Sequence, residues 1–240
     1  MIALLTYPPL GHSFSLSPFC AKAALLLDYS GQPWRREDTN DPRTAPYRKL
    51  PAIRTAEGRV IGDSDAIRLY LEGLGADFQP GLSDIEKAFS RALIRMAEEH
   101  LYFHVVLDRW GRDEVWPTVR QMYFHELPAL LRKPISNGLR RSLMRGMDAQ
   151  GLGRFSPQER LERAEQDLGA ITDLLWQGPY LMGATVTLAD MSVAPILNAI
   201  RQTPVETPFA LRVAGDPILT EYIDRVEEAV HGPKTARLTA

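Results

Sequence analysis

The chain of 240 residues is long enough for one large domain or two small ones, each with an apolar core. Its composition, 45% apolar and 24% charged, is typical of a globular protein, and a net charge of -2 argues against binding to nucleic acid or an acidic membrane. No apolar run is long enough to span a bilayer, and the first residues lack the basic lead of a secretory signal. The single cysteine, Cys20, excludes an internal disulfide, so we expect a reducing compartment, the cytoplasm.

The first 75 residues combine short strand-like runs with two helices. Residues 2–6 form an apolar run that ends at two prolines, which predicts a buried strand and a turn. Ser17 and Pro18 are favoured at a helix start, and the helix should end near the breakers at 31–33.

A second group of elements follows within the same 75 residues. Residues 34–38 indicate a weak strand, residues 51–55 and 59–61 a hairpin, and Asp63-Ser64 the start of a second helix. The order strand, helix, strand, loop, strand, strand, helix is that of a small α/β thioredoxin-like domain.

Beyond a linker at residues 73–83, rich in glycine, the pattern becomes helical, and we predict a second, all-helical domain over residues 84–240. Five long helices are expected, at residues 84–110, 114–131, 157–176, 188–201 and 217–230. Residues 138–153 have helical character without a firm place, and residues from 232 on are expected to fray.

Three segments of the first domain carry the functional argument. Ser17 lies at a helix start with Cys20 one turn inside, Lys49-Leu50-Pro51 precedes a strand, and Asp63-Ser64 precedes the second helix. Taken alone, each has a structural explanation: a helix cap, a proline at a strand edge and another helix cap.

Their order and spacing together resemble the glutathione-site signature of the cytosolic glutathione S-transferases, where a similar proline run precedes a hairpin and an acidic or Gln residue followed by Ser. The resemblance extends over the whole chain, because a helical domain follows at the expected place. Residues 17–22 and the Asp63-Ser64 pair also look like the metaxin and "failed axon connections" branch, some members of which have no established transferase activity.

The resemblance implies how glutathione would be held. Leu50 would pair its backbone with the cysteinyl part, which requires a cis peptide before Pro51. Asp63 and Ser64 would take the γ-glutamyl end, and Lys49 would approach the glycyl carboxylate. Asp63 is shorter than the Glu or Gln of many relatives.

Ser17 is the candidate partner of the glutathione thiolate. A hydrogen bond to a charged group is worth about 1.5–3 kcal/mol, which lowers a thiol pKa of about 8.5 by roughly one to two units. Ser15, in the same loop, and Tyr7, after the first strand, are the alternatives. Cys20 occupies the usually buried second position of a thioredoxin-type motif, which argues against a mixed disulfide and a redox activity.

The electrophile site is expected between the domains, against the first long helix. His100, His104 and Asp108 share a face of this helix and could bind a metal, but a polar pocket wall or domain interface is the simpler interpretation, and we predict no metal. The nearby aromatic residues, at 102, 103, 110, 116 and 123, are interpreted as core, and Arg140, Arg141 and Arg145 as a solvated face. Thr187 and Asp190 form a structural capping box.

The sequence therefore predicts a glutathione S-transferase that conjugates glutathione to a small electrophile as a homodimer. The alternative is a non-catalytic binding protein with the same fold.

Overall fold

The computed structural model describes residues 1–231, and its first strand is the predicted apolar run. β1 (Ile2–Thr6) lies inside a four-stranded sheet of order β2-β1-β3-β4. β2 (Trp34–Asp38) is parallel to β1, whereas β3 (Ala52–Arg54) and β4 (Val60–Gly62) form an antiparallel hairpin beside it. A parallel pair needs a crossover connection, and helix α1 (Pro18–Tyr29) provides it.

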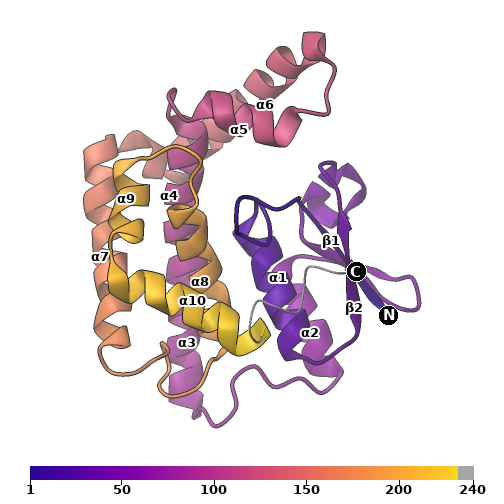
Figure 1. Cartoon of the computed structure of the whole chain (residues 1–240), viewed down its shortest axis with the longest axis vertical. Coiled ribbons are helices and arrows are strands. Elements are labelled where there is room, and N and C mark those ends of the chain that lie inside the picture. The colour runs from indigo at the N-terminus through magenta and orange to yellow at the C-terminus, as the bar shows by residue number, and fades with distance from the viewer. Residues whose placement is uncertain (232–240) are drawn as a thin grey trace.

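Helices α1 and α2 (Ser64–Gly73) lie side by side between the sheet and the helical half of the molecule (Figure 1). Short 3₁₀ turns at Pro42–Thr44 and Pro46–Arg48 occupy the predicted loop between β2 and β3. This half of the structure confirms the predicted thioredoxin-like α/β architecture.

The second half is all-helical, as predicted. Its first helix is continuous through α3 (Asp84–Met96) and α4 (Tyr102–Val106), with π-helical stretches at Ala97–Leu101 and Leu107–Gly111. The helices that follow are α5 (Trp116–Phe124), α6 (Ala129–Gln150), α7 (Pro157–Leu175), α8 (Leu188–Arg201), α9 (Pro208–Ala214) and α10 (Pro217–His231). A 3₁₀ turn at Leu152–Arg154 separates α6 from α7.

Helix α8 is buried along almost its whole length and contacts α1, α3 and α10, so it joins the two halves in one apolar core. Its predicted cap is present: the buried Asp190 carboxylate accepts hydrogen bonds from the backbone and hydroxyl of Thr187, at 2.8 and 3.0 Å. The same carboxylate accepts from the Leu181 N–H and the Tyr222 hydroxyl, both at 2.9 Å. Burial raises its pKa, and these hydrogen bonds oppose that rise.

One predicted helix was wrong in detail, one segment had been left unplaced, and one short helix was missed. The single helix predicted over residues 114–131 is interrupted after Phe124, because Pro128 disfavours a helical conformation at the residue before it and instead occupies the N-cap of α6. α6 then runs through Pro134 and residues 138–150, which the sequence left unplaced. The seven-residue α9, capped by Thr207, was not predicted.

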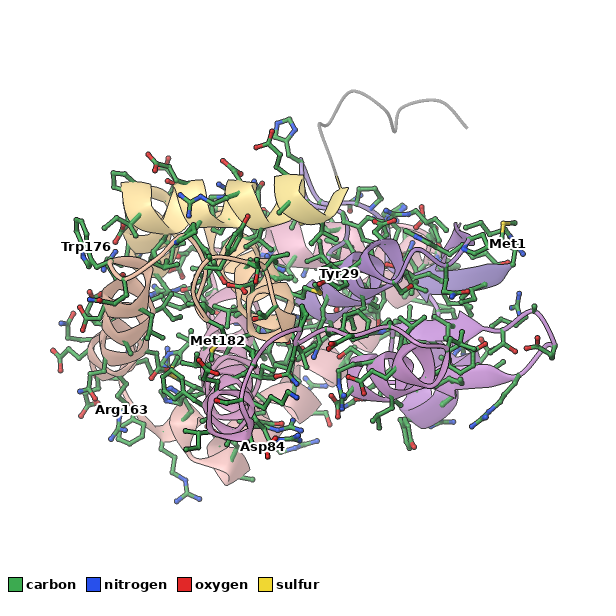
Figure 2. The ribbon with its side chains drawn as sticks, turned by 90° about the horizontal axis from the view of Figure 1, so that it is seen from below. Met1, Tyr29, Asp84, Arg163, Trp176 and Met182 are labelled. Carbon is green, nitrogen blue, oxygen red and sulfur yellow. The ribbon has the colours of Figure 1, made fainter. Side chains whose placement is uncertain are left out.

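Within residues 1–231, none of the helices combines the length and the apolar character that a membrane span requires. The residues from 232 on, for which fraying is expected, lie outside the described part of the chain. Met1 and Trp176 lie at opposite ends of the molecule, with the sheet near the first and α7 near the second (Figure 2).

Candidate functional site

Leu50, just before β3, has backbone N–H and C=O groups that are not paired within the sheet. The peptide bond between Leu50 and Pro51 is cis, as the resemblance requires. The Leu50 side chain is buried, and within residues 1–231 its N–H and C=O form no hydrogen bond with other backbone groups. Such a position can pair with an extended peptide in the manner of an added strand. The exposed Lys49 side chain lies beside it and forms no ion pair with a described carboxylate.

The start of α2 lies next to this position, because the Asp63 N–H donates to the Pro51 carbonyl at 3.2 Å. One Asp63 carboxylate oxygen accepts from the N–H groups of Asp65 and Ala66, at 2.8 and 3.3 Å. The other carboxylate oxygen accepts no hydrogen bond from a described residue, and the Asp63 side chain is exposed. The Ser64 hydroxyl also has no hydrogen-bond partner among the described residues. Asp63 has a positive φ of 79°, a conformation that costs a non-glycine residue about 1–3 kcal/mol and is concentrated at ligand sites.

The loop into α1 distinguishes the two candidate serines. Ser15 is buried; its Oγ donates to the Tyr7 carbonyl at 2.8 Å and accepts from the Thr6 hydroxyl at 3.1 Å. It also accepts from the Ser17 N–H at 3.3 Å, so its hydrogen-bonding capacity is used inside the loop. Ser17 occupies the N-cap position, as predicted, but its half-buried hydroxyl makes no capping hydrogen bond.

Cys20 lies one turn inside α1 and is fully buried in a small apolar cluster that also contains Leu50 and Tyr7. Burial raises the pKa of its thiol, an effect that nearby polar groups, chiefly the Thr6 hydroxyl, only partly oppose. The cluster therefore brings the start of α1 next to the Leu50–Pro51 segment, with an unreactive thiol between them.

Tyr7, Tyr102 and Tyr123 meet between the two halves of the chain. The rings of Tyr7 and Tyr123 are 5.7 Å apart in an edge-to-face arrangement, and Tyr102 packs at 4.7 Å against Phe19 of α1. Burial raises the pKa of Tyr102 to about 12 and raises those of Tyr7 and Tyr123, so all three keep their protons near pH 7. Tyr123 donates to the Leu16 carbonyl at 3.3 Å, whereas no described residue hydrogen-bonds to the other two hydroxyls.

Arg109 is a residue that the sequence analysis missed. It lies in the second π-helical stretch, is buried, and donates to the carbonyls of Leu16, at 3.1 Å, and Ala199. Burial lowers its pKa, and its Nε has no partner among the described residues. It therefore ties the loop that carries Ser17 to α8. The available signal was an arginine within the run 105–110, in which Asp108 is the only other charged residue.

The predicted His100, His104 and Asp108 face is turned toward α7 and α9, away from the glutathione segments. His100 pairs with Asp167 of α7, and Asp108 pairs with Arg112 and with Thr207 beside α9. Among residues 1–231 there is no group of three or more His, Cys, Asp or Glu residues that could hold a metal ion.

A thioredoxin-like domain with a cis-proline segment, joined to a helical domain that closes one side of it, defines a glutathione-transferase fold. Family models agree: the glutathione S-transferase N-terminal domain matches residues 18–115, and the C-terminal domain of the same family matches residues 157–225. The chain belongs to the glutathione S-transferase superfamily. The finer resemblance to the metaxin-like branch stays a hypothesis.

Individual relatives agree with this assignment. The chain is 28% identical over 236 residues to an isoprene-epoxide glutathione S-transferase from Rhodococcus sp. (strain AD45), covering 95% of this chain and 98% of the relative. It shares its fold with a glutathione transferase from Phanerochaete chrysosporium (TM-score 0.66, 20% identity, 94% and 95% of the two chains). A delta-class enzyme from Nilaparvata lugens is similar (TM-score 0.60, 16% identity, 97% and 91%).

Proposed function

We propose that this protein is a glutathione transferase that adds the glutathione thiolate to a small epoxide. The observation that supports glutathione binding is the unpaired backbone N–H and C=O of Leu50, which lies before the cis Pro51 and next to the start of α2. The epoxide class rests on the named Rhodococcus relative and on the tyrosine hydroxyls that lie near α1.

Glutathione would lie as an extended peptide along the Leu50 segment. The N–H and C=O of Leu50 pair with the cysteinyl residue, as a short added strand. At the γ-glutamyl end, the unused oxygen of Asp63 meets the amine, and the hydroxyl of Ser64 at the start of α2 meets the carboxylate. Lys49 supplies the positive charge for the glycyl carboxylate.

Ser17 would activate the thiol. Its hydroxyl is not used for capping, whereas that of Ser15 is committed to three hydrogen bonds within the loop. Tyr7 is a poorer candidate for this role than Ser17, because its ring packs against Tyr123 in the tyrosine cluster. A hydrogen bond from Ser17 to the thiolate, helped by the positive end of α1, favours the ionised form, and the thiol proton passes to solvent.

The thiolate then attacks one epoxide carbon. A carbon–sulfur bond forms, the carbon–oxygen bond breaks, and the electron pair remains on oxygen as an alkoxide. The hydroxyls of Tyr7 and Tyr102 have no protein partner among the described residues and keep their protons at neutral pH, so either can hydrogen-bond to this oxygen as charge develops. The alkoxide takes up a proton, which gives a hydroxy thioether.

Conjugation assays with a small aliphatic epoxide and with chlorodinitrobenzene test the proposal. Ser17→Ala should lower kcat/KM for both substrates by about tenfold near pH 7, since the thiolate fraction falls as the thiol pKa returns toward about 8.5. Ser13→Ala is the matched control, because this buried loop hydroxyl has no hydrogen-bond partner among the described residues and should be dispensable. Tyr102→Phe should slow only the epoxide reaction.

The outcomes separate the alternatives. Glutathione binding without turnover of either electrophile would favour the non-catalytic binding protein. Absence of glutathione binding would overturn the whole proposal. Turnover of chlorodinitrobenzene but not of epoxides would retain the transferase and reject the epoxide class.

A twofold homodimer in the cytoplasm completes the proposal. The support for the dimer is the family, and the support for the cytoplasm is a single, buried and unpaired Cys20. Sedimentation of the purified chain would decide the oligomeric state.

A further inference from the structure

A cavity of about 360 Å³ lies between the long helix, α7 and α9. Figure 1 shows α7 and α9 on the side of α4 that faces away from α1 and the sheet. The cavity is therefore separated from the glutathione segments by the long helix. Its volume falls within the range of small-molecule sites, roughly 300–1,000 Å³.

The walls of this cavity combine apolar and polar side chains. Leu161 of α7 and Phe209 of α9 supply apolar surface, and His104 of α4 packs against Phe209 with ring centroids 5.8 Å apart. His104 is 4% exposed, and its Nε2 is a buried atom without a hydrogen-bond partner in the described residues. An unpaired buried polar atom is costly, so a ligand that bonds to it gains free energy.

Two arginines line the cavity, Arg112 and Arg160, and only Arg112 forms an ion pair with a described carboxylate. Asp108 accepts from Arg112 through one oxygen and from the Thr207 hydroxyl through the other, both at 2.6 Å, so its charge is already matched. Glu114, outside the cavity, also pairs with Arg112. Arg160 donates to the Phe155 carbonyl at 2.9 Å and forms no ion pair with any carboxylate of residues 1–231.

We propose that this cavity is a second ligand site, distinct from the glutathione site, for a small organic carboxylate with an apolar or aromatic body. The carboxylate binds Arg160 and takes a hydrogen bond from His104, and the body packs against Leu161 and Phe209. Arginine is suited to this role, since its planar guanidinium binds a carboxylate through two parallel hydrogen bonds.

The test uses hydrocinnamate as the probe and its neutral amide, hydrocinnamide, as the comparison. Both are titrated calorimetrically into the full chain with saturating S-hexylglutathione present, which occupies the glutathione site and the space beside it. The proposal predicts one hydrocinnamate per chain and binding of hydrocinnamide at least about tenfold weaker, because the amide lacks the charge that Arg160 recognises.

Two arginines of α7 provide a matched pair of variants. Arg160→Gln should weaken hydrocinnamate binding by about tenfold or more. Arg163→Gln should leave it unchanged, because Arg163 lies over the Phe155 ring at 3.9 Å and outside the cavity lining. Figure 2 shows Arg163 at the end of the molecule opposite Met1. Leu161→Trp, which fills the cavity, should abolish binding while circular dichroism shows the fold intact.

Three results would overturn the proposal: no hydrocinnamate binding, loss of binding when S-hexylglutathione is present, or equal weakening by Arg160→Gln and Arg163→Gln. The arginine variants decide the question even if Leu161→Trp fails to fold.

Discussion

Lys22 and Glu98 form a buried ion pair that joins the two halves of the chain. Lys22 lies on α1 and Glu98 on the first π-helical stretch, with Nζ and Oε1 2.6 Å apart and side chains only 2% and 7% exposed. Lys22→Met keeps most of the side-chain volume and removes the positive charge. Glu98 is then left as a buried carboxylate without its partner.

The size of the effect follows from this burial. Breaking a buried pair by removing one partner costs about 3–5 kcal/mol, because the remaining charge stays desolvated. Arg95 lies 3.8 Å from the other Glu98 oxygen but is half exposed, so it compensates only in part. We therefore expect Lys22→Met to lower the free energy of unfolding by about 3 kcal/mol, at the lower end of that range.

Denaturation in guanidinium chloride measures this change. The protein concentration is held fixed, because the stability of the proposed homodimer would depend on it. The double variant Lys22→Met/Glu98→Leu should recover most of the loss, since replacing both charges with apolar groups is often neutral. A loss below about 1 kcal/mol in the single variant, or no recovery in the double variant, would refute the reasoning.

Three further variants test other parts of the structure. Burial lowers the pKa of His104 from 6.5 to about 3, so between these values only the unfolded state binds the proton. Stability therefore decreases as the pH is lowered from 6.5, by up to about 1.4 kcal/mol per unit, and His104→Gln should flatten this dependence in denaturation series between pH 4 and 7. Asp190→Ala should cost about 3 kcal/mol or more in thermal unfolding, because four donors, among them Tyr222, lose their acceptor; an unchanged Tm would contradict this. Arg109→Lys should lower both stability, by about 2 kcal/mol, and turnover, because an ammonium cannot reach the carbonyls of Leu16 and Ala199 together; full activity would show that the loop needs no such tie.

Local signals in the sequence were sufficient for the sheet and for most helices. The strand Ile2–Thr6 is followed by two prolines, α1 begins at Pro18, and the hairpin turns at Gly58, where φ is +86°. These boundaries depend on residues whose backbone preferences act within a few positions, so they can be predicted without knowledge of packing.

Features that depend on packing were harder to predict. The seven-residue α9 is too short for a periodic pattern, and it is held by the Thr207 cap and by burial of Phe209. Helix α6 includes Pro134 and Gly138, and the low helix propensity of these two residue types argues against a helix there. Whether such segments are helical depends on their tertiary contacts.

The candidate site divides in the same way. Leu50, Pro51, Asp63 and Ser64 were found because they are close in sequence to a recognisable pattern, and their glutathione roles stay a prediction. The interdomain position of Arg109 could not be found in this way, because its contacts with Leu16 and Ala199 span about 90 residues in either direction.

The most direct test of the account is the pKa of the glutathione thiol when bound to the protein. Ultraviolet difference spectra of the bound thiolate, recorded across pH 5 to 9, give this pKa for the wild-type chain and for the Ser17→Ala and Ser13→Ala variants. The account predicts a value near 7 for the wild type and the Ser13 control, and a rise of roughly one to two units in Ser17→Ala. An unchanged pKa in Ser17→Ala would contradict the assignment of Ser17, and no bound thiolate at any pH would contradict the account as a whole.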